Sequence, residues 1–227
     1  MGFLRILWLI LRKDLTVEIR SGEIALTALL FAVSCVLVFA FAFVRQGVPP
    51  DGAAAAVLWI AVLFAGTLAL GRTFDRERQS ETLRALLLAP AARPAVYAGK
   101  LAGIVALMLG IELLLVPLTA FLFQDPLFAH PLWLTAILLT GTLGFASVGT
   151  LFAAMLVRAR SRDMLLPVLL YPISVPVIIA SVQGTDALLQ PEINVAVLRF
   201  WVTLLTCFDV VFVTLALWTF EALMTES

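Results

Sequence analysis

Two acidic residues lie inside long apolar runs, and they have the clearest potential for chemistry in this chain. Glu112 lies in the run 101–123 and Asp209 in the run 200–220, and neither run contains a Lys or Arg. An ionised carboxylate near the centre of a bilayer costs at least about 2.5 kcal/mol. We therefore expect each acid to be protonated, to face a hydrated cavity or to bond to a partner subunit. Two roles stay open, hydrogen bonding between helices and a place in a transport or gating path.

The other residue types exclude several kinds of catalytic and metal site. Histidine occurs once, at His130, and the two cysteines, Cys35 and Cys207, lie in separate apolar runs. These residues supply neither a zinc ligand set nor a C-x-x-C redox motif. The dipeptide Gly99-Lys100 lacks the remaining residues of a phosphate-binding loop. We predict no catalytic residue, no metal site and no directly bound cofactor, so that any ATP hydrolysis would come from a separate chain.

Composition and hydropathy predict an integral membrane protein. Of the 227 residues, 63% are hydrophobic and 13% are charged, whereas soluble domains have roughly 45–50% apolar and 25% charged residues. Basic and acidic residues both number 15, so the net charge gives no sign of a nucleic-acid partner. A membrane-spanning helix needs about 20 apolar residues. We predict an all-α integral membrane protein with one domain, 1–227, and six transmembrane helices at 24–44, 53–71, 101–123, 133–157, 164–182 and 200–220.

The basic residues predict the orientation of these helices. Thirteen of the 15 Lys and Arg residues lie in 1–23, 72–100 and 158–163, and the other two are Arg45 and Arg199. Loops rich in Lys and Arg stay in the cytoplasm. Both termini and the segment 72–100 are therefore predicted to be cytoplasmic.

The N-terminal segment 1–23 has the pattern of an amphipathic helix lying in the membrane interface. Five apolar residues share one helical face, while the charged residues fall elsewhere. They are Leu4, Leu7, Trp8, Leu11 and Leu15. No small-residue cleavage site follows the short apolar block, which argues against a signal peptide. A longer first helix that extends into the cytosol is the alternative.

The segment 72–100 is the most charged part of the chain and contains a second short amphipathic pattern. Ser80 can cap a helix whose apolar face is Leu83, Leu86 and Leu87 and which ends before Pro90. Such a helix either lies on the membrane surface or fits a groove in a soluble partner.

Prolines and small residues mark the places where helices bend or approach one another closely. Pro167, Pro172 and Pro176 predict a kinked helix in 164–182. Small residues permit close helix contacts in membranes. They are Gly99, Gly103, Gly141, Gly144, Ser147 and Gly149.

Several of these segments resemble the haem exporter protein B family (CcmB), the membrane subunit of the ABC-type complex in cytochrome c maturation. The closest likeness is in the segments 141–154 and 165–180, the second of which holds the three prolines. Shorter similarities are Arg76-Glu77-Arg78, 86–90, Gly99-Lys100, 208–212 and Phe220-Glu221. The chain departs from the family where Glu81 and Arg84 replace a usual glycine and a usual acid.

The resemblance implies a permease in the bacterial inner membrane that supports haem delivery to a periplasmic haem chaperone, with haem as possible cargo. ATP would be hydrolysed by a CcmA-like ATPase subunit, and CcmC-like and CcmD-like membrane subunits, a second copy of this chain and membrane lipid are further expected partners. The residues implied to couple to the ATPase are Glu81, Thr82, Leu83, Leu86, Leu87 and Pro90. The alternatives are an ABC export permease for another substrate, such as a lipid or glycan, and a membrane assembly scaffold that transports nothing.

Overall fold

The computed structural model describes residues 2–43, 50–79, 93–156 and 162–223. The described residues form helices and no strand. The elements are α1 (Phe3–Ser21), α2 (Glu23–Phe43), α3 (Ala53–Gln79), α5 (Arg93–Phe123), the short 3₁₀ helix η2 (Leu127–Ala129), α6 (Pro131–Met155), α7 (Arg162–Leu189) and α8 (Val195–Leu223). Six of them, α2, α3, α5, α6, α7 and α8, are long and apolar enough to cross a membrane. The predicted all-α fold with six membrane-spanning helices is confirmed.

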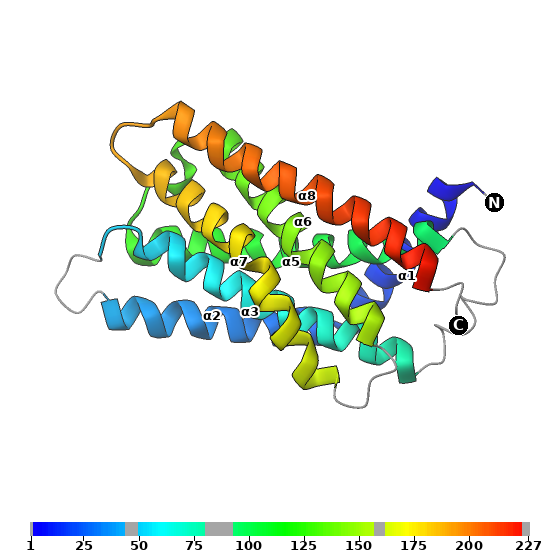
Figure 1. Ribbon diagram of the computed structural model, residues 1–227. Helices are drawn as coiled ribbons and strands as arrows, with labels where there is room; N and C mark the ends of the chain where they lie inside the picture. Colours follow the sequence, from blue (N-terminus) through cyan, green and yellow to red (C-terminus); the bar gives the residue numbers. More distant parts are fainter. Residues whose placement is uncertain (1, 44–49, 80–92, 157–161, 224–227) are drawn as a thin grey trace.

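The helices form an elongated bundle with both chain termini at one end (Figure 1). We call this end the terminal end, and the end with the α5–α6 and α7–α8 connections the opposite end. Helices α3 and α6 are the most buried, and α2 and α8 are the most exposed. Helix α6 packs against α5, α7 and α8, while α3 packs against α2, α5 and α7. The centre of the bundle is therefore built around α3 and α6.

A large apolar core extends through the bundle, and a second, small apolar cluster lies between α1 and α5. The largest side chains of the large core come from the central helices. Trp59 of α3 and Phe145 of α6 are fully buried. Gly66 leaves space for this packing, because a Cβ there would lie 2.7 Å from the Phe145 ring and 2.6 Å from the Met108 methyl group. Large and small residues thus alternate across the helix contacts, as close-packed interiors require.

Helices α1 and α2 are separated by a sharp break at Gly22. Gly22 has φ +61°, a left-handed conformation that favours glycine, and its N–H donates to the Glu18 carbonyl at 2.6 Å. The Glu18 side chain then accepts a hydrogen bond from the Ala25 N–H at 2.7 Å, in the first turn of α2. Helix α1 is therefore a helix of its own and not an extension of the first span.

The helices that flank the segment 72–100 extend further than the apolar runs predicted. Helix α3 continues to Gln79 and α5 already begins at Arg93. An α-helix does not have to end where its apolar run ends, and Pro94 suits the first turn of α5. Helix α7 also extends beyond its predicted span, to Leu189, and it is continuous across Pro167, Pro172 and Pro176. The predicted coupling residues 81–83, 86, 87 and 90 lie outside the described residues.

Candidate functional site

The two acids predicted inside the membrane both lie against α6. Glu112 of α5 and Asp209 of α8 are 1% and 5% exposed. Glycine, serine and threonine make up much of the middle of α6, and most of these residues are fully buried. Small side chains let neighbouring helices approach closely in a membrane. Helix α6 is thus the element that positions both carboxyl groups.

Glu112 connects α5 to α6 through one of its two oxygens. The Thr142 hydroxyl of α6 donates a short hydrogen bond to Glu112 Oε1. The other oxygen, Oε2, is buried and has no partner among the described residues. This arrangement fits a hydrogen bond between helices, one of the two roles that the sequence left open.

Asp209 lies in a notch on α6 and its Oδ1 has no hydrogen-bond partner in the described part of the chain. A Cβ at Gly144 would lie 2.8 Å from Asp209 Oδ1 and 3.1 Å from a Val177 methyl group. Glycine is therefore needed there for steric reasons. Asp209 also shares the buried stripe of α8 with Leu198 and Leu205. Unlike Glu112, Asp209 forms no hydrogen bond between helices in the part of the chain that the structure describes.

The two acids lie on different sides of α6. Thr142 marks the Glu112 side and Gly144 marks the Asp209 side. Residues two apart on an α-helix are separated by about 200° around its axis. The structure therefore does not bring Glu112 and Asp209 together into one shared carboxylate site.

A second group of polar side chains, between α3, α6 and α7, was not predicted from the sequence. The Trp59 indole N–H donates to the Thr185 hydroxyl at 2.9 Å, joining α3 to α7. Gly141 of α6 leaves room for this contact, because a Cβ there would lie 2.4 Å from the Trp59 ring and 2.5 Å from Ser181 Oγ. Ser174 and Ser181 are fully buried, and their hydroxyls have no partner among the described residues. The seven-residue spacing of these serines was the available signal, because it places both on one face of a helix.

Helix α1 is fixed to α5 by a buried ion pair that the sequence did not reveal. Lys100 Nζ lies 2.7 Å from Asp14 Oδ2, and the Lys100 side chain is only 5% exposed. Gly99 and Gly103 face α1: a Cβ at Gly99 would lie 2.9 Å from Ile10 Cβ, and one at Gly103 would lie 3.6 Å from Asp14. The predicted close contact at Gly99 and Gly103 thus belongs to the α1–α5 interface.

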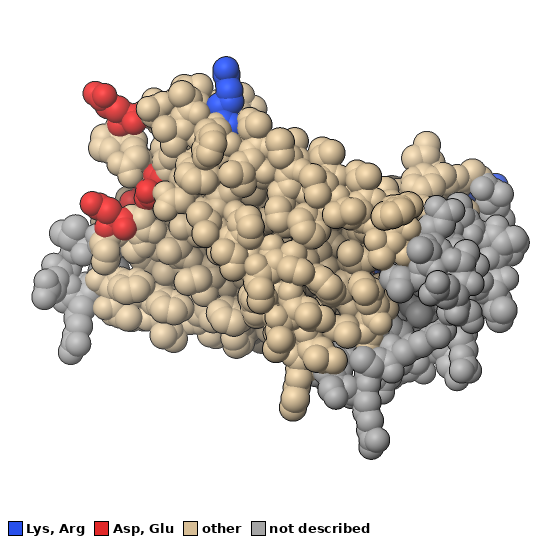
Figure 2. Space-filling model, viewed as in Figure 1, with Lys and Arg blue, Asp and Glu red and all other residues tan. Residues whose placement is uncertain are grey.

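On the face that Figure 2 shows, the described charged side chains gather mainly at the opposite end, and the middle of the bundle is uncharged. Asp51, Asp125, Asp186 and Glu192 lie at the helix ends and connections of the opposite end. Burial raises the pKa of Asp125, and the nearby charge of Asp186 raises it further. The uncharged band between the two ends is what a helical membrane protein presents to lipid.

The described residues contain no group of three or more His, Cys, Asp or Glu side chains that could hold a metal ion. Cys35 and Cys207 are both free thiols. The polar side chains described above lie instead in pairs and small groups between helices. They can hold helices in register or line a path between them, which is the chemistry of a transmembrane subunit.

Comparison with known proteins identifies the family. The CcmB protein family model matches residues 5–226. The chain is 34% identical to heme exporter protein B of Rhodobacter capsulatus over 171 residues, which are 75% of this chain and 78% of that protein. It is 29% identical to heme exporter protein B of Bradyrhizobium diazoefficiens over 186 residues, 79% of this chain and 81% of that protein. With six membrane-spanning helices and a family match along nearly its whole length, the chain belongs to the CcmB protein family.

Proposed function

We propose that this chain is the permease subunit of an ABC-type complex in the bacterial inner membrane that supports haem export for c-type cytochrome biogenesis. The observation that carries the proposal is the family match over residues 5–226, together with the similarity to two proteins named heme exporter protein B. In this proposal haem is cargo of the complex and not a resident cofactor. The chain itself is not catalytic.

The distribution of charge supports an orientation with both termini in the cytoplasm. Thirteen of the 15 Lys and Arg residues belong to segments that the topology assigns to the terminal end. Asp51, Asp125, Asp186 and Glu192 belong to the opposite end, with Arg199. The positive-inside rule then places the terminal end in the cytoplasm and the opposite end in the periplasm.

A CcmA-like ATPase subunit would contact the segment between α3 and α5. The proposed coupling residues are Glu81, Thr82, Leu83, Leu86, Leu87 and Pro90. The chain enters this segment from α3 and leaves it into α5, and these two helices pack against each other. Because α3 also packs against α7, a displacement of the segment would be passed to the proline-containing helix. We infer that α7, with Pro167, Pro172 and Pro176, bends during this motion.

The contacts of the two acids support different roles for them. Glu112 is hydrogen-bonded to Thr142, which favours a structural role between α5 and α6. Asp209 Oδ1 is buried without a partner, beside Gly144 and Val177. An unpaired polar atom at this depth is costly, so we infer that Asp209 takes part in the rearrangement of α6, α7 and α8 during gating.

Isolation of the native complex tests the proposed function. An epitope-tagged chain, purified from its own membranes in mild detergent, is expected to retain an ATPase subunit and further membrane subunits resembling CcmC and CcmD. Loss of every ATPase subunit under conditions that keep the chain folded would exclude both a haem-export permease and an export permease for a lipid or glycan. A scaffold would then be the remaining alternative.

A further inference from the structure

Helix α1 presents three distinct faces, and the most buried of them packs against α5. The contact face contains Ile6 and Ile10, which are 7% and 6% exposed, and continues to Asp14 at its ion pair with Lys100. These residues follow one another at four-residue intervals, as on one side of a helix. The other two faces of α1 are therefore available to the surroundings of the protein.

The second face is an exposed apolar stripe. Leu4, Trp8 and Ile19 are 77%, 60% and 83% exposed, and Leu11 and Leu15 lie half-buried beside them. A stripe of this kind on a membrane protein is covered by acyl chains when the helix lies in the interface. Trp8 in particular has the amphipathic ring that concentrates at the headgroup level.

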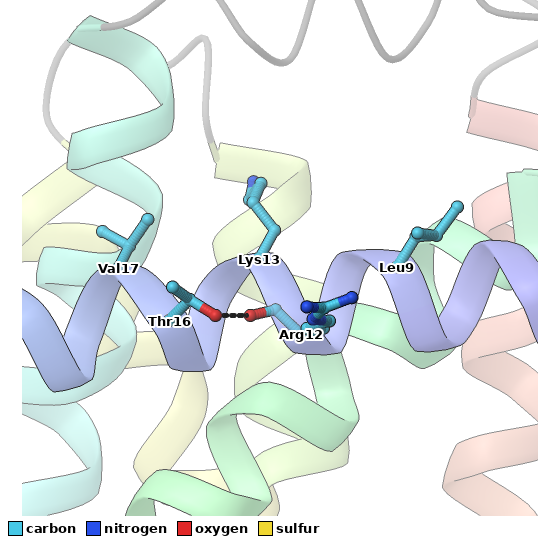
Figure 3. A pocket seen from close by; sticks show the side chains of 5 residues that line it. All are labelled: Leu9, Arg12, Lys13, Thr16 and Val17. Atoms are coloured by element: carbon cyan, nitrogen blue, oxygen red, sulfur yellow. Dashed lines mark hydrogen bonds between the residues drawn. The ribbon is translucent and has the colours of Figure 1, made fainter.

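The third face carries the cations and adjoins the stripe. Figure 3 shows a depression along α1 lined by Leu9, Arg12, Lys13, Thr16 and Val17. Arg12 lies one helical turn after Trp8, so the depression begins where the apolar stripe ends. Lys13 is already paired with Asp14 at 3.0 Å, and the Thr16 hydroxyl donates to the Arg12 carbonyl at 2.6 Å.

We propose that α1 binds the headgroup of an anionic phospholipid at Arg12 and Lys13, with the acyl chains of that lipid against the Trp8 stripe. The positive charges of Arg12 and Lys13 can pair with a phosphate group. The flanking apolar side chains of Leu9 and Val17 can contact the hydrocarbon that is joined to it. An acidic protein segment would satisfy the cations but would leave the stripe of Leu4, Trp8 and Ile19 uncovered. The proposal rests on the membrane location of the chain and not on haem export.

The ion pair between Asp14 and Lys100 connects the proposed lipid site on α1 to the rest of the bundle. Lys13 and Lys100 pair with the two oxygens of the same carboxylate, that of Asp14. A phosphate bound to Lys13 would therefore lie next to the ion pair that joins α1 to α5. We infer that the anionic lipid fixes the position of α1 relative to the first turns of α5.

Quenching of Trp8 in reconstituted full-length protein tests this proposal. The protein is placed in phosphatidylcholine nanodiscs that contain a small fraction of brominated lipid, either phosphatidylglycerol or phosphatidylcholine. The signal of Trp8 is the difference between wild type and Trp8→Phe. The attraction of one Lys or Arg to an anionic lipid surface corresponds to a factor of about five in binding. We expect brominated phosphatidylglycerol to quench Trp8 several-fold more efficiently than brominated phosphatidylcholine at the same mole fraction.

In the double variant Arg12→Gln/Lys13→Gln, the two brominated lipids are expected to quench Trp8 equally. The matched control is Arg199→Gln, an exposed arginine at the opposite end, which should keep the wild-type preference. Equal quenching by the two lipids in wild type would overturn the proposal, as would a preference that survives the double substitution. If neither lipid quenches Trp8 while an isolated ATPase subunit binds wild type and not the double variant, the depression is a protein contact and the proposal is wrong.

Discussion

Asp14 and Lys100 form a buried ion pair, with Oδ2 and Nζ 2.7 Å apart, that joins the N-terminal helix to the start of α5. Lys100 is the more buried partner: 5% of its side-chain surface is exposed, compared with 18% for Asp14. A buried ammonium group is tolerated only when it is paired. The charge of Asp14 therefore stabilises the buried Lys100, and the pair holds α1 against α5.

Removal of one partner of this pair should destabilise the protein. Asp14→Asn removes a charged partner of the buried Lys100, and breaking a pair in this way costs about 3–5 kcal/mol when it is fully buried and less where one partner is partly exposed. We expect a clear decrease in the thermal unfolding temperature of the purified protein. The double variant Asp14→Leu/Lys100→Met should be more stable than Asp14→Asn. The control Lys13→Met alters an exposed lysine and should change little; an Asp14→Asn variant as stable as this control would contradict the ion-pair account.

Two glycines on the same face of α5 should respond differently to alanine. At Gly99 a Cβ would lie 2.9 Å from Ile10 Cβ and 3.2 Å from the Leu7 carbonyl oxygen, whereas at Gly103 the nearest atom is 3.6 Å away. Gly99→Ala should therefore force α1 away from α5 at a cost of about 1–3 kcal/mol. Gly103→Ala should be neutral or slightly stabilising, since alanine favours a helix by about 1 kcal/mol over glycine. Thermal unfolding of the two variants side by side measures the difference, and equal effects would refute this packing.

Substitutions at Glu112 and Asp209 should act independently. Glu112→Gln keeps an oxygen that can accept from Thr142, whereas Glu112→Leu removes the bond, and such bonds contribute about 0.6 kcal/mol and at most about 1.7 kcal/mol in membranes. Asp209→Asn should leave stability nearly unchanged and reduce transport, if Asp209 serves gating. Because the two residues lie on different sides of α6, their effects on unfolding free energy should add within about 0.5 kcal/mol. A larger coupling in the double variant would show that they share one site.

Asp125 gives a pH dependence whose sign follows from its environment. Burial, and then the charge of Asp186, raises the pKa of Asp125 in the folded protein. The folded state therefore binds this proton more tightly than the unfolded state, and stability decreases as the pH rises from about 4, the unfolded pKa. Asp125→Asn should remove this loss, so that the variant gains more in unfolding temperature at neutral pH than at acidic pH. The exposed Asp51→Asn serves as the control, and an equal gain at both pH values would contradict the prediction.

The sequence predicts the spans well because each apolar run is long and ends at charged residues or at turn residues. It also identifies Glu112 and Asp209, because no other acid lies in the middle of the runs. The neighbours of these acids could not be predicted, because the sequence does not show which helices contact one another. Thr142, which donates a hydrogen bond to Glu112, lies on another helix. The same limit hides the partner of Lys100, since Asp14 is 86 residues away.

Hydropathy also does not predict where a helix ends within a charged segment. Helix α3 runs to Gln79 and α5 starts at Arg93, although the apolar runs end at 71 and begin at 101. Charged residues are good helix formers, and hydropathy reports only the part of a helix that contacts lipid. Hydropathy also does not distinguish the polar side chains of α7, because two serines seven residues apart, Ser174 and Ser181, hardly change the mean hydropathy of a long apolar run.

If this chain is the permease subunit of a haem-export complex, a strain that lacks it should form no holo-cytochrome c. Deletion is expected to abolish covalent haem attachment to c-type cytochromes, and the wild-type chain is expected to restore it. A normal level of holo-cytochrome c in the deletion strain would exclude this function.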